Sequence, residues 1–305
     1  MSVFLRRLGV TAGTVLAVLV TVFLLVRLVP GDPVEVMLGE RASGADRAQL
    51  VVQLGLDRPL PAQLAAYLGD LARLDLGQSL RYRLPVADLI GARLPATVQL
   101  AAAALVLALA LALPLGVAMA VRGGAPGGRV AAAFTLLGLA LPGFWLGPLL
   151  VLVFAVHLGW LPVAGRESPA SVVLPALTLA LGLAAVLARQ LAANLSEALA
   201  ADHVRTARAK GLTPAQVLWR HGVRNALLPV VTVFGLQLGA LLGGAVITET
   251  VFAWPGLGSL TVEAISARDY PLLQGCVLLI ATTYVIVNGL TELAYAWADP
   301  RVRRP

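Results

Sequence analysis

The chain has 305 residues, of which 59% are hydrophobic and 13% are charged, and its formal net charge is +7. Soluble domains carry about 25% charged residues, so this composition excludes an ordinary soluble domain and predicts an all-α polytopic membrane protein. The positive charge lies at the flanks and in the loops of apolar runs, where it encodes membrane topology. Trp219 is the only aromatic residue of the most basic loop, which argues against nucleic acid as a partner.

Metal, disulfide and nucleotide chemistry are also poorly supported. Cys276 is the only cysteine and sits in an apolar run, which excludes an intrachain disulfide and predicts a small buried filler. His157, His203 and His221 lack the HExxH pattern and paired ligand spacing, which argues against a zinc site. Lys210 is the only lysine, and the chain has no G-x-x-x-x-G-K-[ST] phosphate-binding loop. Any ATPase that drives this chain must therefore belong to another subunit.

The N-terminal segment, residues 1–30, carries an apolar run at 8–28 behind Arg6 and Arg7. This run is longer than the apolar region of a typical signal peptide, and no small-x-small cleavage site follows it. We therefore expect an uncleaved first span with its N-terminus in the cytoplasm. The sequence PGDP at 30–33 then stops the helix.

Residues 31–93 are the only long polar interval of the chain, with seven arginines and eight carboxylates. Helix-like pieces are predicted at 45–54 and 60–74, separated by turn residues. By alternation across the membrane, this interval is expected to form a small external segment.

Five further apolar runs lie within residues 94–297 and predict the transmembrane core. The expected spans are 94–121 (entered through Pro95 in its first turn), 130–158, 171–191, 225–247 and 271–297. Residues 249–270 are expected to form an external loop. Six spans in total place both termini in the cytoplasm, with residues 298–305 as a basic tail.

Two of these spans carry features that shape helices. Pro142 and Gly143 allow the third span to kink. Gly235, Gly239 and Gly243 give the fifth span a stripe of small residues, which favours close helix packing over a pore constriction.

Six polar residues lie within or near the spans, where such groups are costly and usually face protein or water. They are Gln99, Arg189, Gln237, Glu249, Asn288 and Glu292. Lining of a translocation path is one interpretation. For Arg189, Glu249 and Glu292, which lie near span ends, snorkelling or interfacial anchoring is favoured. None of the six carries a cargo-binding assignment.

The most charged interval between apolar runs is 202–229, which alternation places in the cytoplasm between the fourth and fifth spans. Apolar and basic residues alternate there at helical spacing, and Gly211 followed by Thr213 and Pro214 predicts a helix, a tight turn and a second helix. Such an element is a candidate docking site for a cytoplasmic partner. The alternative is a solvated loop that only satisfies the positive-inside rule.

A series of short motifs, spread nearly from end to end of the chain, resembles the inner-membrane permease subunits of binding-protein-dependent ABC importers, in the dipeptide, oligopeptide and nickel group. These motifs are LVPGDP at 28–33, LGLDRPL at 54–60, DLGQS at 75–79, LGWLP at 158–162, ETVF at 249–252, PGLG at 255–258, DYP at 269–271 and DPR at 299–301. The interval 202–229 is similar to the family's EAA motif, in which a short helix ends at a glycine and an LP pair follows.

The resemblance assigns an ATPase-docking coupling loop within 193–224 and at the LP pair. Its residues are Arg205, Thr206 and Ala207 at the EAA positions, then Arg208, Lys210, Gly211, Leu212, Leu228 and Pro229. Arg205 replaces the initial glutamate of the motif, and the gap from Gly211 to the LP pair is long, as in the peptide group. We expect Ala207, Leu212 and Val217 to be buried as apolar anchors while arginines orient the contact.

The resemblance also implies a type I ABC importer permease fold in a bacterial cytoplasmic membrane. The chain would have no catalytic residue and no cofactor, and two cytoplasmic ATPase subunits would bind ATP and Mg²⁺. A second, related permease and an extracytoplasmic substrate-binding protein complete the implied complex, and the external segment 31–93 is the favoured contact for the binding protein. The cargo would be a peptide, a nickel chelate or another small solute.

Two other classes of function compete with the importer permease. A single-subunit secondary transporter or channel would show inverted halves or a chain of buried carboxylates, and neither is visible. An intramembrane enzyme would need a nucleophile and base or a metal site at membrane depth, and no GxSxG or HExxH pattern occurs.

Overall fold

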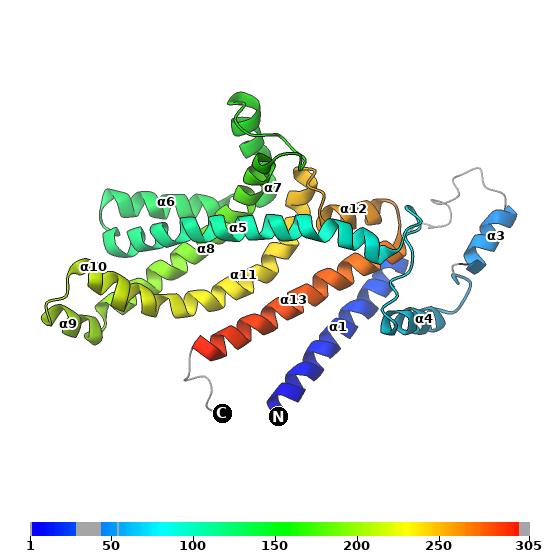
Figure 1. The fold of residues 1–305 in the computed structure, drawn as a ribbon, viewed down its shortest axis with the longest axis horizontal. Helices are drawn as coiled ribbons and strands as arrows, with labels where there is room; N and C mark the ends of the chain where they lie inside the picture. The colour runs from blue at the N-terminus through cyan, green and yellow to red at the C-terminus, as the bar shows by residue number, and fades with distance from the viewer. Residues whose placement is uncertain (1, 29–43, 54, 299–305) are drawn as a thin grey trace. The chain divides into compact units, whose positions relative to one another are not determined.

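A computed structural model of the chain describes residues 2–28, 44–53 and 55–298 (Figure 1). Among these residues the regular elements are helices, and the only β pairing is a single antiparallel bridge between Gln78 and Pro85. The predicted all-α class is confirmed. The PGDP motif at 30–33 and the tail at 299–305 lie outside the described residues.

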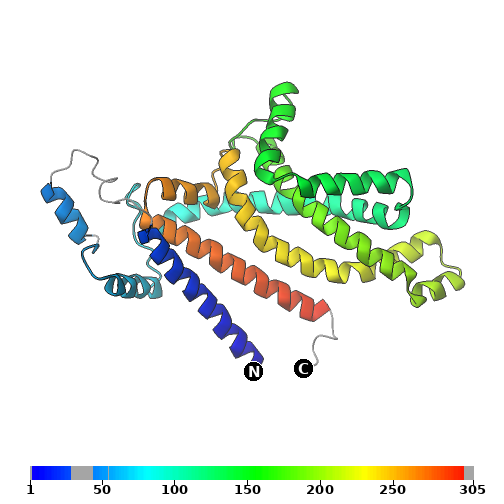
Figure 2. The same cartoon turned by 180° about the vertical axis from the view of Figure 1, so that it is seen from behind.

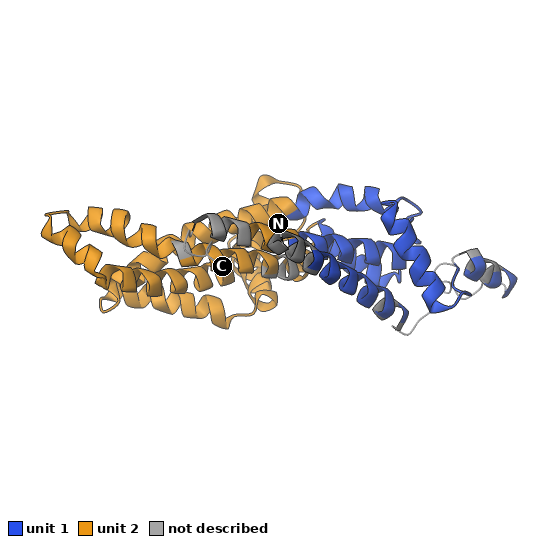
Figure 3. Cartoon of the chain, turned by 90° about the horizontal axis from the view of Figure 1, so that it is seen from below, with its two compact units in different colours: residues 1–97, 255–285 blue, residues 98–254, 286–305 orange. Residues whose placement is uncertain are grey.

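The chain divides into two compact units, coloured separately in Figure 3. The first comprises residues 1–97 and 255–285, and the second comprises residues 98–254 and 286–305. Helices α5 (Val86–Arg122) and α13 (Tyr270–Ala298) contribute residues to both units. The other helices of the first unit are α1 (Ser2–Leu28), α3 (Gly44–Gln53), α4 (Leu60–Ala72) and α12 (Leu257–Ser266).

The second unit holds the remaining helices. These are α6 (Pro126–Ala140), α7 (Gly143–Leu150), α8 (Val173–Ala200), α9 (Asp202–Ala209), α10 (Pro214–Gln216) and α11 (Arg224–Val251), with π-helices η1 (Val151–His157) and η3 (Val217–Val223) and the short 3₁₀ helix η2 (Pro169–Val172).

Three helical segments of the described chain are long and apolar enough to cross a membrane singly. They are Val86–Arg122, Pro169–Ala200 and Tyr270–Thr291. Two bent pairs bring the number to as many as five: Pro126–Ala140 with Gly143–His157, bent by 110°, and Pro214–Leu227 with Pro229–Gly239, bent by 47°. The sixth expected span is α1, whose apolar stretch Ala12–Leu24 is shorter. The kink at Pro142 and Gly143 is confirmed, and it is a full break between α6 and α7.

Two expected boundaries differ from the structure. Helix α5 begins at Val86, where the backbone N–H groups of Asp88 and Leu89 both donate to the Pro85 carbonyl. Pro95 therefore lies inside the helix instead of in its first turn. The loop expected at 249–270 contains the end of α11 and the whole of α12. Its sequence LGSLTVEAIS places apolar residues at helical spacing, and that face is buried.

The core of the first unit joins the start of α5 to α12 and the start of α13. Buried residues at its centre are Val86, Ile90, Leu257, Leu260, Ala264, Leu272 and Cys276. Gly275 allows the close approach of two of these helices, because a Cβ atom there would lie 2.6 Å from Cγ1 of Val86. Cys276 has no exposed surface, which confirms its role as a buried filler.

Helices α1 and α4 of the first unit are joined by aromatic and polar contacts. The rings of Phe23 and Tyr67 stack with their centroids 5.8 Å apart. The Arg27 guanidinium lies 3.5 Å from the Phe23 ring centroid and donates from Nε to Oε1 of Gln63 at 2.9 Å. These contacts fix the start of α4, whose first residue follows Pro59.

Helix α8 is the most buried helix of the second unit and packs against α6 and α11 (Figures 1 and 2). Small residues permit this packing. A Cβ atom on Gly138 of α6 would lie 3.0 Å from the Leu181 carbonyl oxygen, and α5 also approaches α8 closely, since a Cβ atom on its Gly116 would lie 2.9 Å from the Ala188 carbonyl oxygen. Gly235 of α11 approaches α13 more closely still, since its Cβ would overlap the side chain of Thr291. The packing role expected for the glycine stripe is therefore confirmed at Gly235.

Candidate functional site

The interval 202–229 forms the helix, turn and helix that its sequence predicts. Helix α9 ends at Ala209, and Gly211 has a φ of +82°, a left-handed conformation that favours glycine. Thr213 and Gln216 then form a capping box: Gln216 Oε1 accepts from the Thr213 backbone N–H at 2.9 Å, and Thr213 Oγ1 accepts from that of Gln216 at 3.4 Å. Helix α10 continues without interruption through η3 into α11.

The apolar residues of this loop are buried within the chain itself. Val204, Ala207 and Val217 form a small core, against which Leu199 and Leu212 pack. The expectation that Ala207 and Val217 act as anchors in a partner is therefore wrong, because their side chains are already enclosed by α9, η3 and the end of α8. The loop is a preformed unit with its own core.

The loop is attached to α8 as well as to α11. Gly222 of η3 lies so close to α8 that a Cβ atom there would be 2.9 Å from Cδ1 of Leu195 and 3.0 Å from Cδ2 of Leu199. Asn225 donates from Nδ2 to the His221 carbonyl at 2.8 Å and lies 3.2 Å from Nε2 of His203, which ties α9 to the start of α11. A displacement of the loop must therefore move α8 and α11 with it.

Basic side chains cover the exposed side of this loop. We call the set the basic surface; its members are Arg205, Arg208, Lys210, Arg220 and Arg224, all of them exposed. Arg205 pairs with Asp202 at 3.4 Å, but both side chains are more than four-fifths exposed, so the pair contributes at most about 1 kcal/mol and leaves Arg205 available to a partner. Trp219 is 58% exposed and is the large apolar residue of the same surface.

The remaining residues of the predicted docking loop have varied positions. Thr206 is exposed and donates from Oγ1 to the Asp202 carbonyl at 3.0 Å. Leu212 is half-buried against the loop core. Pro229 lies inside α11 at the 47° bend, where it removes a helical hydrogen bond. Leu228 belongs to α11, but its side chain lies outside the described residues.

The polar residues noted within the spans fall into different environments. Gln99 accepts a hydrogen bond from Nε of Arg166 at 2.9 Å, and the guanidinium of Arg166 lies 5.7 Å from the ring centroid of Trp254. Gln237 lines a pocket between α8 and α11. The Glu249 side chain is fully buried, so the favoured snorkelling interpretation is wrong for this residue.

Arg189 is exposed on α8, which is compatible with the anchoring role expected for it. The Oδ1 atom of Asn288 is buried and has no hydrogen-bond partner among the described residues. The side chain of Glu292 lies outside the described residues.

Two of the family-like motifs, DLGQS at 75–79 and DYP at 269–271, meet in the first unit, a contact that no local pattern predicts. Ser79 of DLGQS donates from Oγ to Oδ2 of Asp269 of DYP at 2.5 Å, and the Arg81 backbone N–H donates to the same oxygen at 3.1 Å. The other carboxylate oxygen, Oδ1, accepts from the Leu272 backbone N–H at 3.2 Å. Beside them, Tyr82 donates to Glu263 at 2.9 Å, and Arg93 lies 3.9 Å from the same carboxylate oxygen.

Comparison with known proteins identifies the family to which this chain belongs. The family model for the binding-protein-dependent transport system inner membrane component matches residues 112–304, and the model for the N-terminal part of such membrane components matches residues 1–101. The chain belongs to this permease family. It is therefore a non-enzymatic membrane subunit of an ABC importer, and the secondary-transporter and intramembrane-enzyme interpretations are set aside.

Curated relatives of the permease match it along their whole length. It is 41% identical to the di/tripeptide transport system permease of Pseudomonas aeruginosa, with 99% of both chains covered. It is 39% identical to the dipeptide transport system permease of Escherichia coli K12, with 98% of both covered. It is 41% identical to the glutathione transport system permease of Pectobacterium atrosepticum, with 99% of both covered.

Solved structures share the permease fold at low sequence identity. An inward-facing structure of the MetNI methionine ABC transporter matches with a TM-score of 0.60 at 19% identity, covering 69% of this chain and 96% of that one. The crystal structure of an amino acid ABC transporter with histidines matches with a TM-score of 0.53 at 16% identity, covering 70% and 94%. These matches confirm the predicted importer-permease fold.

Proposed function

We propose that this permease carries di- or tripeptides across the bacterial cytoplasmic membrane, and that the loop at 202–229 is its docking element for a cytoplasmic ATPase. The cargo is supported by the names of three relatives that are about 40% identical along their whole length, two of them peptide permeases and the third a permease for glutathione, itself a tripeptide. The docking role is supported by the loop's own structure.

The observation that carries the docking proposal is the coupling of a rigid basic loop to two long helices. The loop has a core of its own, and η3 lies against the end of α8 while it continues into α11. An ATPase that pulls on this loop displaces both helices at once. Because packed helices shift as rigid bodies, the displacement reaches the membrane without local unfolding.

The basic surface also supports a cytoplasmic location for the loop. Loops rich in lysine and arginine remain on the cytoplasmic side, and this loop carries five basic residues against Asp202 alone. If α1 and both bent pairs cross the membrane, the proposed complex has six spans per chain, with both termini in the cytoplasm and the segment 31–93 outside, where it would receive a substrate-binding protein. Two ATPase subunits, which bind ATP and Mg²⁺, and a second related permease complete the proposed complex.

Purification of the tagged chain from its native membrane in mild detergent tests this function. We expect an ATPase, a second permease and a binding protein to be recovered with it, and we expect the complex in liposomes to accumulate a dipeptide only with ATP and the binding protein. Recovery of the chain alone, moving solute without ATP, would overturn the proposal.

A further inference from the structure

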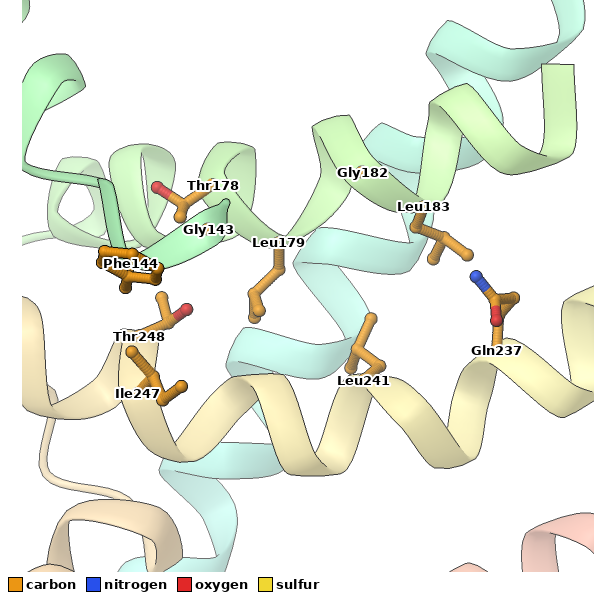
Figure 4. Close-up of a pocket in the computed structure, with 10 residues that line it drawn as sticks. All are labelled: Gly143, Phe144, Thr178, Leu179, Gly182, Leu183, Gln237, Leu241, Ile247 and Thr248. Atoms are coloured by element: carbon orange, nitrogen blue, oxygen red, sulfur yellow. The ribbon is translucent and has the colours of Figure 1, made fainter. Parts of the chain in front are cut away.

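A pocket of about 280 Å³ opens in the second unit between α8, α11 and the start of α7 (Figure 4). Its walls are mostly apolar, with Leu183 and Leu241 facing each other from α8 and α11. Gly182 of α8 lines it with no side chain and so leaves room between the helices. Ligand sites commonly measure about 300–1,000 Å³, and this pocket lies just below the lower end of that range, so it suits only a small solute.

Gln237 is the polar residue of this pocket whose side chain lacks a hydrogen-bond partner within the described part of the chain. In Figure 4 its amide points toward Leu183, into the space between the helices. The residue is at the midpoint of α11, about 20 Å from either end at 1.5 Å per residue. At such a depth an unpaired amide is costly, and because Gln237 is only partly buried, a partner from outside the chain, such as water or a ligand, can reach it.

The two threonines at the other end of the pocket already have partners. Thr178 donates from Oγ1 to the Leu174 carbonyl at 2.9 Å, and Thr248 also has a partner. Thr248 lies eleven residues beyond Gln237 on α11, so the pocket extends along the helix for about 16 Å. A ligand that fits the pocket is elongated, apolar along its sides and able to form hydrogen bonds with the Gln237 amide at one end.

A short peptide has these properties. An extended dipeptide is about 7 Å long at 3.3–3.6 Å per residue, and a tripeptide is about 10 Å long. The glutamine side chain offers two N–H donors and a carbonyl acceptor, which match the carbonyl and N–H of a peptide bond. Such pairing reads the backbone, which every peptide shares, while apolar walls accept varied side chains.

The side chains of the pocket walls also favour weak binding of a transported peptide over tight binding. No charged side chain lines the pocket among the described residues, so the charged termini of a peptide are not held there by ion pairs. One neutral hydrogen bond and a few apolar contacts give weak retention. A site on a transport path must bind well enough to be entered and weakly enough to be left.

We infer that this pocket is a transit site for a di- or tripeptide, in which the Gln237 side-chain amide pairs with a backbone amide of the cargo. The inference rests on the proposed peptide transport and adds the place where the permease itself contacts its cargo. Water alone and a lipid acyl chain are the other occupants that the experiments distinguish.

The first experiment compares dipeptide uptake by the complete complex in liposomes. In Gln237→Leu the amide is lost and the size is kept, and we expect the half-saturating concentration of binding-protein-bound dipeptide to rise roughly fivefold to tenfold, the effect of one neutral hydrogen bond. Gln190→Leu is the matched control, because Gln190 is a partly buried glutamine of α8 that lies outside the pocket. ATPase recovery with the Gln237→Leu variant should equal wild type, since the pocket is remote from the loop. Equal uptake by Gln237→Leu and wild type would overturn the transit site.

The second experiment measures access to the pocket and does not depend on how Gln237→Leu folds. In a Cys276→Ala background, which has no other cysteine, Leu241→Cys introduces a thiol in the pocket wall. We expect a water-soluble maleimide to modify it and a saturating dipeptide to slow that reaction several-fold. Leu236→Cys, on the same helix, 60% exposed and outside the pocket, should be unaffected by dipeptide.

Each outcome has one meaning. Modification of Leu241→Cys at the same rate with and without dipeptide would mean that water alone fills the pocket. No modification would mean that lipid or packing closes it. Either result overturns the transit site, whereas peptide uptake by the wild-type complex would still support the proposed function. A wild-type complex that carries another solute and no peptide would overturn the proposed cargo, and that result appears before any variant is compared.

Discussion

Ser79 and Asp269 are 190 residues apart in sequence, yet the hydroxyl of the first donates to the carboxylate of the second at 2.5 Å. The Asp269 side chain has no exposed surface, and backbone N–H groups of Arg81 and Leu272 also donate to it. A buried carboxylate that accepts three hydrogen bonds has both of its oxygens paired and can be buried without a large energetic cost. The DLGQS and DYP motifs are therefore two halves of one structural joint between the loop before α5 and the start of α13.

Asp269→Ala should destabilise the first unit. It leaves the Ser79 hydroxyl and two backbone N–H groups without their acceptor, at a cost of roughly 3–5 kcal/mol. Thermal unfolding of the purified chain in detergent should show a clear fall in melting temperature. Asp70→Ala is the control, since that carboxylate is exposed and its pair with Arg73 contributes little. Equal melting temperatures for the two variants would contradict the structural role of the joint.

Gly211→Arg should abolish transport while the chain still inserts in the membrane. With a φ of +82°, this position disfavours any residue with a Cβ by about 1–2 kcal/mol, and the added side chain lies where a partner must approach. The measurement is peptide uptake by intact cells, normalised to the amount of permease in the membrane. Gly124→Arg, in another loop and without a positive φ, serves as the matched control. Normal uptake with Gly211→Arg would rule out the docking assignment.

Charge reversal on the basic surface should release the ATPase. Arg205 and Arg208 lie three positions apart on α9 and so share a face of that helix. We expect them to meet acidic residues of the ATPase, so the double variant Arg205→Glu/Arg208→Glu should reduce ATPase recovery at least tenfold. Wild-type recovery should also fall as salt is raised.

Arg73→Glu provides the control for added negative charge, because Arg73 is as exposed as Arg205 and lies in the segment 31–93 that we propose to be external. Unchanged ATPase recovery by the double variant, accompanied by altered membrane topology, would instead support the interpretation that the loop only follows the positive-inside rule.

Tyr82 should titrate above its ordinary range. The hydrogen bond to Glu263 raises its pKa above 10.0, with burial and the charge of Glu263 acting in the same direction. Because the folded pKa is higher than the unfolded one, this contact stabilises the first unit fully below about pH 10 and is lost as the pH rises through the folded pKa.

Ultraviolet absorbance of tyrosinate, taken as the difference from a Tyr82→Phe variant, measures this titration. Glu263→Gln should move the pKa of Tyr82 down toward its ordinary value, whereas Glu167→Gln, in the other unit, should leave it unchanged. A titration of Tyr82 that is the same in both variants would contradict the contact.

The sequence by itself determined the features that depend on neighbouring residues. Apolar runs long enough for a bilayer predicted the helical class and most of the span positions, and Gly211 with Thr213 and Pro214 predicted the turn of the docking loop. The break at Pro142 and Gly143 was equally visible, because proline and glycine act on the backbone where they stand.

Only the tertiary structure decided which residues meet. Periodicity indicates that a residue such as Ala207 has an apolar neighbour, but not whether that neighbour belongs to a partner or, as here, to Val204 and Val217 of the same chain. The position of Glu249 near the end of a predicted span favours an interfacial anchor, yet its side chain is buried. The joint of Ser79 and Asp269 and the pocket at Gln237 arise from helices brought together over long separations, and such packing depends on the shapes of whole helices, which no local pattern contains.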